Sequence, residues 1–146
     1  MKKERLLIVT GGNRGIGRQI ALSALDAGWK VAISYSFSQK LASDMEIASN
    51  GRIKAFPLDV TNSNSIGDFF KEIVKEMGPA DALVTAAGID NGQRSVAELD
   101  HEFVMSTMDV NVVGLILCCQ EFAKQAIDTG RPGIIVNLSS MAATIG

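Results

Sequence analysis

A glycine-rich segment near the N-terminus has the residue types and spacing of a phosphate-binding loop. It reads Thr10-Gly11-Gly12-Asn13-Arg14-Gly15-Ile16-Gly17. Gly11 is placed to turn the chain sharply, Gly15 to let the backbone approach a pyrophosphate, and Gly17 to let a helix pack closely. A helix that begins here would also present free N–H groups and a favourable dipole to phosphate. We therefore expect a dinucleotide to be bound by Thr10, Gly11, Asn13, Arg14, Gly15, Ile16 and Gly17.

The spacing of this segment counts against another phosphate chemistry. The pattern is Gly-x-x-x-Gly-x-Gly rather than the commoner Gly-x-Gly-x-x-Gly, and it lacks the Gly-Lys-Ser/Thr of a P-loop. Nucleoside-triphosphate hydrolysis is therefore disfavoured. A glycine turn that binds nothing is the remaining alternative, and the elements on either side of the segment count against it.

Short apolar runs typical of buried strands alternate with helical patterns along the whole chain. Strands are predicted over 5–10, 30–34, 52–58, 82–85 and 134–138. Helices are predicted over 15–27, 39–49, 62–77 and 109–128, with one broken or two short helices over 95–108. We expect Ser38 to start the second helix, Thr61 to cap the third, and Asp100 to cap a helix inside the broken region.

This alternation predicts an α/β fold built from βαβ units. Right-handed crossovers then place helices on both faces of a parallel sheet. The natural solution is a Rossmann-type, doubly wound sheet with strand order 3-2-1-4-5, whose ligand lies where the order reverses. The loops over 10–17 and 85–92 should therefore face the same ligand.

Several segments in the same order along the chain resemble motifs of the short-chain dehydrogenase/reductase family. The resemblance covers nearly the whole chain and rests on Thr10-Gly11-(x)3-Gly15-Ile16-Gly17, Leu58-Asp59-Val60, Ala86-Ala87-Gly88, Asp109-Val110-Asn111 and Ile135-Val136-Asn137-Leu138-Ser139-Ser140. The chain departs from the family where Thr85 and Ala86 replace two asparagines. None of the later motifs identifies the family by itself, but five matches in the right order do.

The resemblance implies roles for residues beyond the glycine-rich segment. Asp59 would bond the adenine ring, and Val60, Ala86, Ala87 and Gly88 would line the cofactor site. Ser140 would position the substrate carbonyl, and Asn111 would support a proton-relay water. The plainer alternatives are that Asp59 is a loop residue, that Asn111 is a polar residue tolerated in a helix, and that Ser139 and Ser140 only end a strand.

The residues after the second strand favour NADP(H) over NAD(H). An acidic residue there would bind the ribose hydroxyls of NAD and repel a 2′-phosphate. This chain has Ser34-Tyr35-Ser36 and no acid before Asp44. Arg14, directly before Gly15, adds a positive charge that the family's NADP-preferring members also carry. We expect Tyr35 and Ser36 to contact the cofactor. The family's frequent arginine after this strand is absent.

The family's chemistry also needs a Tyr-x-x-x-Lys pair that these residues do not contain. Tyr35 is the single tyrosine, and the last lysine is Lys124. We therefore interpret residues 1–146 as the cofactor-binding, N-terminal half of a reductase similar to 3-oxoacyl-[acyl-carrier-protein] reductases or sugar and polyol dehydrogenases. A non-catalytic dinucleotide-binding or regulatory module is the alternative. A flavodoxin-like signalling domain would need an acidic cluster at the strand ends, which is lacking.

Composition and charge argue against several other classes. The net charge of −2 gives no case for binding nucleic acid or an anionic membrane. The longest apolar run, 110–119, is too short to span a bilayer. No signal-peptide core is present, and the adjacent Cys118 and Cys119 form neither a disulfide framework nor a zinc site, so we expect a cytoplasmic protein.

Two apolar segments predict self-association. The helix from Asp109 is apolar on nearly all sides, and the strand over 134–138 would be an exposed edge. The resemblance implies a homodimer or homotetramer for the intact enzyme. A helix buried within a monomer's core is the alternative.

Overall fold

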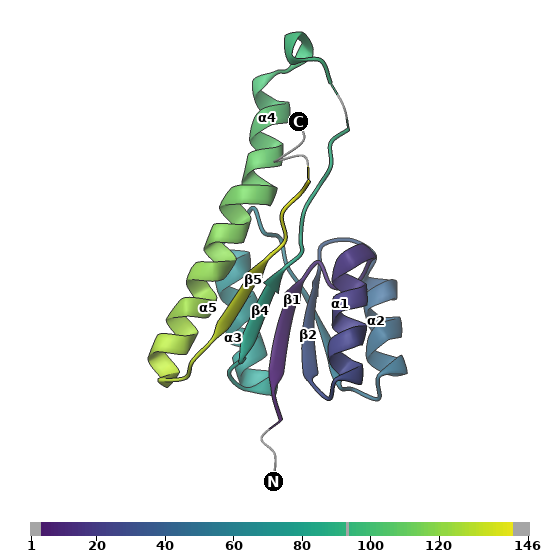
Figure 1. Ribbon diagram of the computed structural model, residues 1–146, viewed down its shortest axis with the longest axis vertical. Helices are drawn as coiled ribbons and strands as arrows, with labels where there is room; N and C mark the ends of the chain where they lie inside the picture. The colour runs from purple at the N-terminus through teal and green to yellow at the C-terminus, as the bar shows by residue number, and fades with distance from the viewer. Residues whose placement is uncertain (1–3, 93, 142–146) are drawn as a thin grey trace.

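A five-stranded parallel sheet forms the centre of the computed structural model, which describes residues 4–92 and 94–141 (Figure 1). The strands are β1 (Leu6–Thr10), β2 (Lys30–Tyr35), β3 (Ile53–Pro57), β4 (Ala82–Thr85) and β5 (Ile134–Asn137). Their order is β3-β2-β1-β4-β5, and every neighbouring pair is parallel. The predicted doubly wound fold and strand order are confirmed. The last five residues of the predicted domain lie outside the described residues.

The helices cover the two faces of the sheet in pairs. They are α1 (Gly15–Asp26), α2 (Gln39–Ala48), α3 (Ser63–Met77), α4 (His101–Met108) and α5 (Leu115–Thr129), with a short 3-10 turn η1 (Val96–Glu98) and a π-helical segment η2 (Asp109–Gly114). In Figure 1, α1 and α2 lie on one side of the sheet, and α3 and α5 lie on the other.

Two hydrophobic cores arise because strand side chains alternate between the faces. Leu6 and Ile8 of β1 join the core under α3 and α5, which also contains Phe69 and Phe122. Leu7 and Val9 join the opposite core, under α1 and α2. β1 is therefore buried on both faces, as its continuous apolar run predicts.

A continuous helix replaces the predicted break before Asp109. Asp100 caps its start, as expected, because its Oδ1 accepts a hydrogen bond from Phe103 N at 2.7 Å. The backbone stays helical at Asp109, with φ −61° and ψ −41°, and α4, η2 and α5 follow one another without interruption. The expected start at Asp109 is wrong. Residues 101–113 contain no glycine or proline that would end the helix, so helical hydrogen bonding continues through Asp109.

The π-helical segment lies where this helix crosses the loop after β3. A Cβ on Gly114 would lie 2.6 Å from Val60 O, so only glycine permits this approach. The helical run His101–Thr129 is long and apolar enough to cross a membrane by length and composition alone. Helices from the core of a globular domain meet the same criterion, and here Cys118 and Phe122 are buried against the sheet.

The start of α3 corrects a second prediction. Asn62, not Thr61, is the cap, because Asn62 Oδ1 accepts hydrogen bonds from Asn64 N at 2.9 Å and Ser65 N at 3.2 Å. The Thr61 hydroxyl instead donates to Asp59 Oδ1 at 2.7 Å. At α2, Ser38 does occupy the cap position, but its side chain makes no capping hydrogen bond.

Candidate functional site

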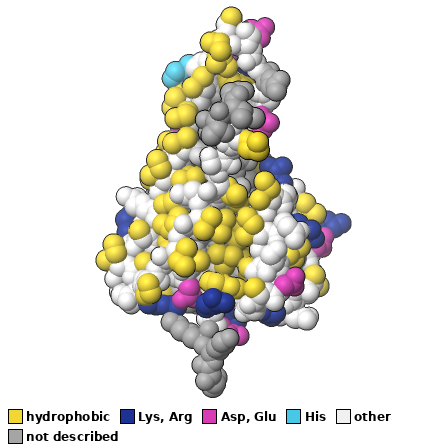
Figure 2. Space-filling view, in the orientation of Figure 1, with side chains coloured by type: hydrophobic (Ala, Val, Ile, Leu, Met, Phe, Trp, Pro, Cys, Tyr) yellow, Lys and Arg dark blue, Asp and Glu magenta, His cyan; other side chains and the backbone are white. Residues whose placement is uncertain are grey.

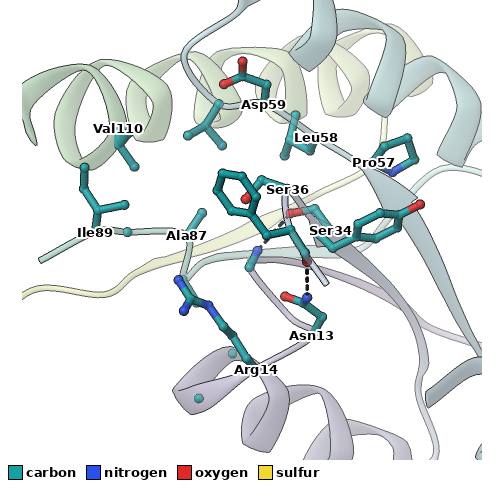
Figure 3. A pocket seen from close by; sticks show the side chains of 18 of the residues that line it. Asn13, Arg14, Ser34, Ser36, Pro57, Leu58, Asp59, Ala87, Ile89 and Val110 are labelled. Atoms are coloured by element: carbon teal, nitrogen blue, oxygen red, sulfur yellow. Dashed lines mark hydrogen bonds between the residues drawn. The ribbon is translucent and has the colours of Figure 1, made fainter. Parts of the chain in front are cut away.

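A cavity of about 1020 Å³ opens at the carboxyl ends of the strands, where the order reverses between β1 and β4. Several segments line it (Figure 3): the glycine-rich loop, the end of β2 with the residues after it, the loop after β3 with the start of α3, the loop after β4, and η2 through Val110. The loops after β1 and β4 therefore face one cavity, as the topology predicts.

Every residue predicted to bind the cofactor lines this cavity except Thr10. The lining contains Gly11, Asn13, Arg14, Gly15, Ile16, Gly17, Tyr35, Ser36, Asp59, Val60, Ala86, Ala87 and Gly88. It also contains residues that were not predicted: Ser34, Phe37, Pro57, Leu58, Thr61, Ser65, Ile89 and Val110. The two predicted catalytic residues, Asn111 and Ser140, are not among the lining residues.

The glycines of the loop serve different structural needs. Gly11 has φ +65°, and a Cβ there would lie 2.9 Å from Ala87 Cα. A Cβ on Gly17 would collide with the Gly11 carbonyl oxygen, so Gly17 packs closely against the loop itself rather than against a strand. Gly15 has φ +53° and open space around its missing Cβ. The loop at Gly15 is thus accessible to a ligand at the N-terminus of α1.

Thr10 lies behind the cavity wall and joins two of the lining loops. Its buried Oγ1 accepts hydrogen bonds from Ala86 N at 3.0 Å and Ala87 N at 3.1 Å. Thr10 is therefore placed to position the loop after β4, and its direct contact with the ligand stays a prediction.

The end of β2 is joined to the glycine-rich loop by three hydrogen bonds. Gly11 N donates to Ser34 Oγ at 2.8 Å, and Gly12 N donates to Ser34 O at 3.1 Å. Asn13 Nδ2 donates to Phe37 O at 2.9 Å. The segment 34–37 is therefore held at a fixed distance from the phosphate-binding loop.

Charges in the cavity are separated between its walls. Figure 3 shows Arg14 and Asp59 on opposite sides. Asp59 Oδ1 accepts hydrogen bonds from the backbone N–H and the hydroxyl of Thr61. Among the described residues, no carboxylate lies within ion-pair distance of Arg14, and no acid occurs in the segment 34–37. An anion approaching Arg14 would therefore meet a cation that none of the described carboxylates neutralises.

Asn111 supports the loop after β4 from the helix. Its Oδ1 accepts from Ile89 N at 2.9 Å, and its Nδ2 donates to Ile89 O at 2.9 Å. A Cβ on Gly88 would lie 3.3 Å from the same Oδ1. The amide of Asn111 therefore satisfies its hydrogen bonds within an apolar helix by fixing one wall of the cavity.

Residues at the ends of β4 and β5 form a second polar group. Thr85 Oγ1 donates to Asn137 Oδ1 at 2.8 Å, and Cys119 Sγ donates to the same oxygen at 3.4 Å. Thr85 is one of the residues that depart from the family pattern, and here it ties β4 to β5. Ser140 follows β5 and is exposed.

The two cysteines and the described acidic residues form neither a thiolate nor a metal cluster. Burial raises the pKa of the Cys118 thiol to about 12, and burial also raises the pKa of Cys119. Neither thiol is therefore a thiolate at neutral pH. Within 4–92 and 94–141, no group of three His, Cys, Asp or Glu side chains is placed to hold a metal ion.

Comparisons with known proteins agree with the motifs. The family model described as short chain dehydrogenase matches residues 5–146. The "Uncharacterized oxidoreductase YgfF" of Escherichia coli (strain K12) is 36% identical over 146 residues, which cover 97% of this chain and 59% of that protein. The 3-oxoacyl-[acyl-carrier-protein] reductase FabG of Staphylococcus aureus (strain Mu50 / ATCC 700699) is 34% identical and is matched over 100% of this chain and 60% of its own length.

Solved structures show the same fold. The structure titled "ElxO with NADP Bound" superimposes with a TM-score of 0.88 at 28% identity, covering 99% of this chain and 58% of that one. A short-chain dehydrogenase from Streptomyces avermitilis gives a TM-score of 0.90 at 25% identity, with coverage of 100% and 53%. The chain spans about 60% of the length of these curated relatives. On the family match along residues 5–146, the chain belongs to the short-chain dehydrogenase family.

Proposed function

We propose that this chain binds a nicotinamide dinucleotide, with NADP(H) preferred over NAD(H), and that it supplies the cofactor-binding half of an oxidoreductase. The observation that carries the proposal is the composition of the cavity. A glycine-rich loop and a helix N-terminus form one wall, no carboxylate of the described residues pairs with Arg14, and the facing segment 34–37 carries no acid. A structural neighbour with NADP bound supports the choice of cofactor class.

The described residues fit such a ligand. The cavity of about 1020 Å³ has the size of a site for a large organic ligand. The open space at Gly15 and the adjoining N–H groups of α1 suit a pyrophosphate. Asp59 and Val60 would face the adenine, and Ala86, Ala87 and Gly88 would line the site beside Gly11.

The preference for NADP(H) follows from electrostatics. A 2′-phosphate is repelled by carboxylates and attracted by a guanidinium group. Arg14 is exposed at the cavity, and Tyr35 and Ser36 stand where an NAD-specific site would have an acid. The two walls that would flank the 2′ position therefore offer hydroxyl groups on one side and one cation on the other.

The bound dinucleotide would supply hydride exchange between its nicotinamide and a carbonyl or alcohol substrate. Ser140 would orient the substrate oxygen, and Asn111 would support proton transfer beside the loop that it holds. Tyr35 is followed four residues later by Gln39, so these 146 residues contain no Tyr-x-x-x-Lys pair. The absence of a positioned general acid costs about 10²–10⁴-fold in rate, and we expect the chain alone to turn over at most slowly.

The substrate, assembly and compartment are proposed from the resemblance. A small carbonyl or alcohol compound is expected, either a 3-oxoacyl thioester or a sugar or polyol. We expect a homodimer or homotetramer in the cytoplasm, without nucleic-acid or membrane partners.

A titration of the purified protein with NADPH and NADH tests the cofactor proposal. We expect tighter binding of NADPH, and we expect Arg14→Ala to weaken NADPH by about tenfold while leaving NADH nearly unchanged, since only NADPH carries the extra phosphate. Equal weakening of both dinucleotides would contradict a phosphate role for Arg14. Tyr35→Asp is the opposite change, and it should shift the preference toward NADH.

A turnover assay distinguishes the proposed enzyme function from the alternative of a non-catalytic binding module. NADPH oxidation by the chain with a 3-oxoacyl thioester, at a rate typical of complete reductases, would contradict the expected low activity. If a longer form of the protein that carries a Tyr-x-x-x-Lys pair binds NADPH but consumes none with carbonyl substrates, the non-catalytic alternative is favoured instead.

A further inference from the structure

An exposed aromatic side chain stands at the mouth of the cavity, directly after β2. Phe37 lines the cavity and is 80% exposed to solvent. Single exposed apolar residues are common on protein surfaces, so exposure alone indicates nothing. Two features distinguish this residue: a hydrogen bond to its backbone and the conformation of the residue that follows it.

The first feature is a buried side chain that bonds to the Phe37 backbone. Asn13 is only 4% exposed, and its Nδ2 donates to Phe37 O at 2.9 Å. Figure 3 shows this bond reaching from the glycine-rich loop, below the cavity, toward the segment after β2. The position of Phe37 is therefore set by the same loop that would hold the phosphates.

The second feature is strain in the next residue. Ser38 has φ +60° and ψ +52°, in the left-handed region that side chains other than glycine rarely adopt. Its own side chain makes no capping hydrogen bond in return. Strain of this kind persists where the surrounding structure imposes it, and it concentrates beside ligand sites.

The loop after β3 adds aliphatic side chains to the cavity near the end of β2. Leu58 and Val60 line the cavity from the loop after β3. Leu58 N donates to Tyr35 O at 2.9 Å, which fixes this loop beside the end of β2. This end of the cavity thus combines the aliphatic side chains of Leu58 and Val60 with an aromatic ring at its mouth, a pair that suits a flat heterocycle better than a phosphate or a sugar.

We propose that Asn13 and Phe37 act as one unit, in which Asn13 positions Phe37 and the Phe37 ring stacks on the purine base of the dinucleotide. The inference rests on the proposed dinucleotide site. Phe37 has no charge, so its contribution should be equal for NADP(H) and NAD(H). Arg14 would discriminate between the two cofactors, whereas Phe37 would add affinity for both.

Binding measurements on Phe37 variants test the stacking. Replacing an aromatic residue that stacks on a base by alanine lowers the affinity by about five- to a hundredfold. We expect Phe37→Ala to weaken NADPH and NADH by the same factor and to leave the affinity ratio between them unchanged. Phe37→Leu, which keeps apolar surface without a ring, should also weaken both. Reduced nicotinamide mononucleotide, which has no purine, should bind wild type and Phe37→Ala alike.

A tryptophan at this position gives a direct readout. Trp29 is the only tryptophan in the chain and precedes β2 at the opposite end of the sheet, about 20 Å away along the six residues of that strand. In Phe37→Trp, we expect 2′,5′-ADP to quench the new fluorescence through base stacking. Wild type, with Trp29 alone, is the control and should show little change.

A double-mutant cycle tests the coupling between the two residues. Asn13→Ala should weaken NADPH binding strongly in wild type and clearly less when Phe37 is already alanine. Equal effects in both backgrounds would overturn the positioning role of Asn13. Unchanged affinity in Phe37→Ala, or no quenching in Phe37→Trp, would overturn the stacking. If wild type binds neither NADPH nor NADH, the proposed dinucleotide site itself fails.

Discussion

β2 and β5 both contain an apolar run, but they lie in opposite environments. β2 reads Lys-Val-Ala-Ile-Ser-Tyr and β5 reads Ile-Ile-Val-Asn. Ile33 of β2 is completely buried, whereas Ile134 of β5 is 64% exposed. β2 pairs with a strand on each side and has helices on both faces, while β5 pairs only with β4 among the described strands. An apolar run therefore predicts a strand, but its neighbours decide whether it is buried.

The exposed apolar surface extends from β5 onto the long helix. Figure 2 shows hydrophobic side chains gathered over the face on which β5 and α5 lie. Val112, Val113 and Ile116 of the helix are exposed, as are Ile134 and Val136 of the strand. β2 is thus packed internally, whereas β5 and the adjoining helix present an exposed apolar surface.

The largest expected difference between the two strands is in stability. Ile33→Ala should lower the free energy of unfolding by about 3 kcal/mol, because it leaves a cavity between β2 and its helices. Ile134→Ala is the matched control and should change it by less than about 0.5 kcal/mol. Urea unfolding of both variants measures the difference. Equal losses would mean that β5 is as well buried in solution as β2.

Removing the hydroxyl of Thr10 should have the next largest effect. Thr10→Val keeps the shape but leaves the N–H groups of Ala86 and Ala87 without their acceptor, at a cost of about 1–3 kcal/mol. The affinity for NADPH should fall as well, because the loop after β4 loses its support. Thr10→Ser retains the oxygen and should keep most of both properties. A stable Thr10→Val variant with normal NADPH affinity would contradict the positioning role.

Association should respond to charge on the exposed helix face. We expect the purified chain to self-associate at micromolar concentration, and Ile116→Lys to weaken that association about tenfold through desolvation of the new charge. Sedimentation velocity measures both, and Lys124→Ala on the same helix is a control without an expected change. A monomeric wild-type chain would show that the exposed apolar face needs no partner.

The smallest expected effect concerns the cap of the long helix. The backbone N–H of Phe103 holds the pKa of Asp100 below its ordinary value, with Arg94 adding to the shift. The stabilisation by this carboxylate is therefore present above the ordinary pKa of an aspartate and is lost as the pH falls through the lowered pKa. Asp100→Asn should remove this part of the acid dependence of unfolding, while Asp68→Asn on α3 should not. An unchanged pH profile in Asp100→Asn would contradict the assignment.

The sequence pattern was sufficient for the strand order and for the glycine-rich loop, and the family resemblance supplied the cavity residues after β3 and β4. The alternation of apolar runs predicts five parallel strands, and β4 begins and ends where the pattern places it. Glycine spacing predicts the loop because Gly11 and Gly17 are required by close backbone approaches that any side chain would block. Both signals are contained within a few consecutive residues.

Contacts between distant elements could not be predicted in the same way. The bond from Asn13 to Phe37 and the bond from Gly11 to Ser34 depend on the register between β1 and β2, which no local pattern specifies. The continuous helix through Asp109 was missed because Asp100 signals a helix start correctly but no residue signals whether that helix ends. Thr61 and Asn62 are both good caps, and only the competing bond from Thr61 to Asp59 decides between them.

The central place of β1 has a consequence for the order in which the molecule assembles. The bond from Gly11 to Ser34 joins residues 23 apart, whereas the bonds from Leu6 to Asp81 and from Ala86 to Thr10 span 75 and 76 residues. Contacts that close long loops form late in folding. β1 and β2 can therefore pair early, while the cavity is completed only when β4 arrives beside β1. Dinucleotide binding during refolding should accordingly report the last step of folding and lag behind the formation of helices.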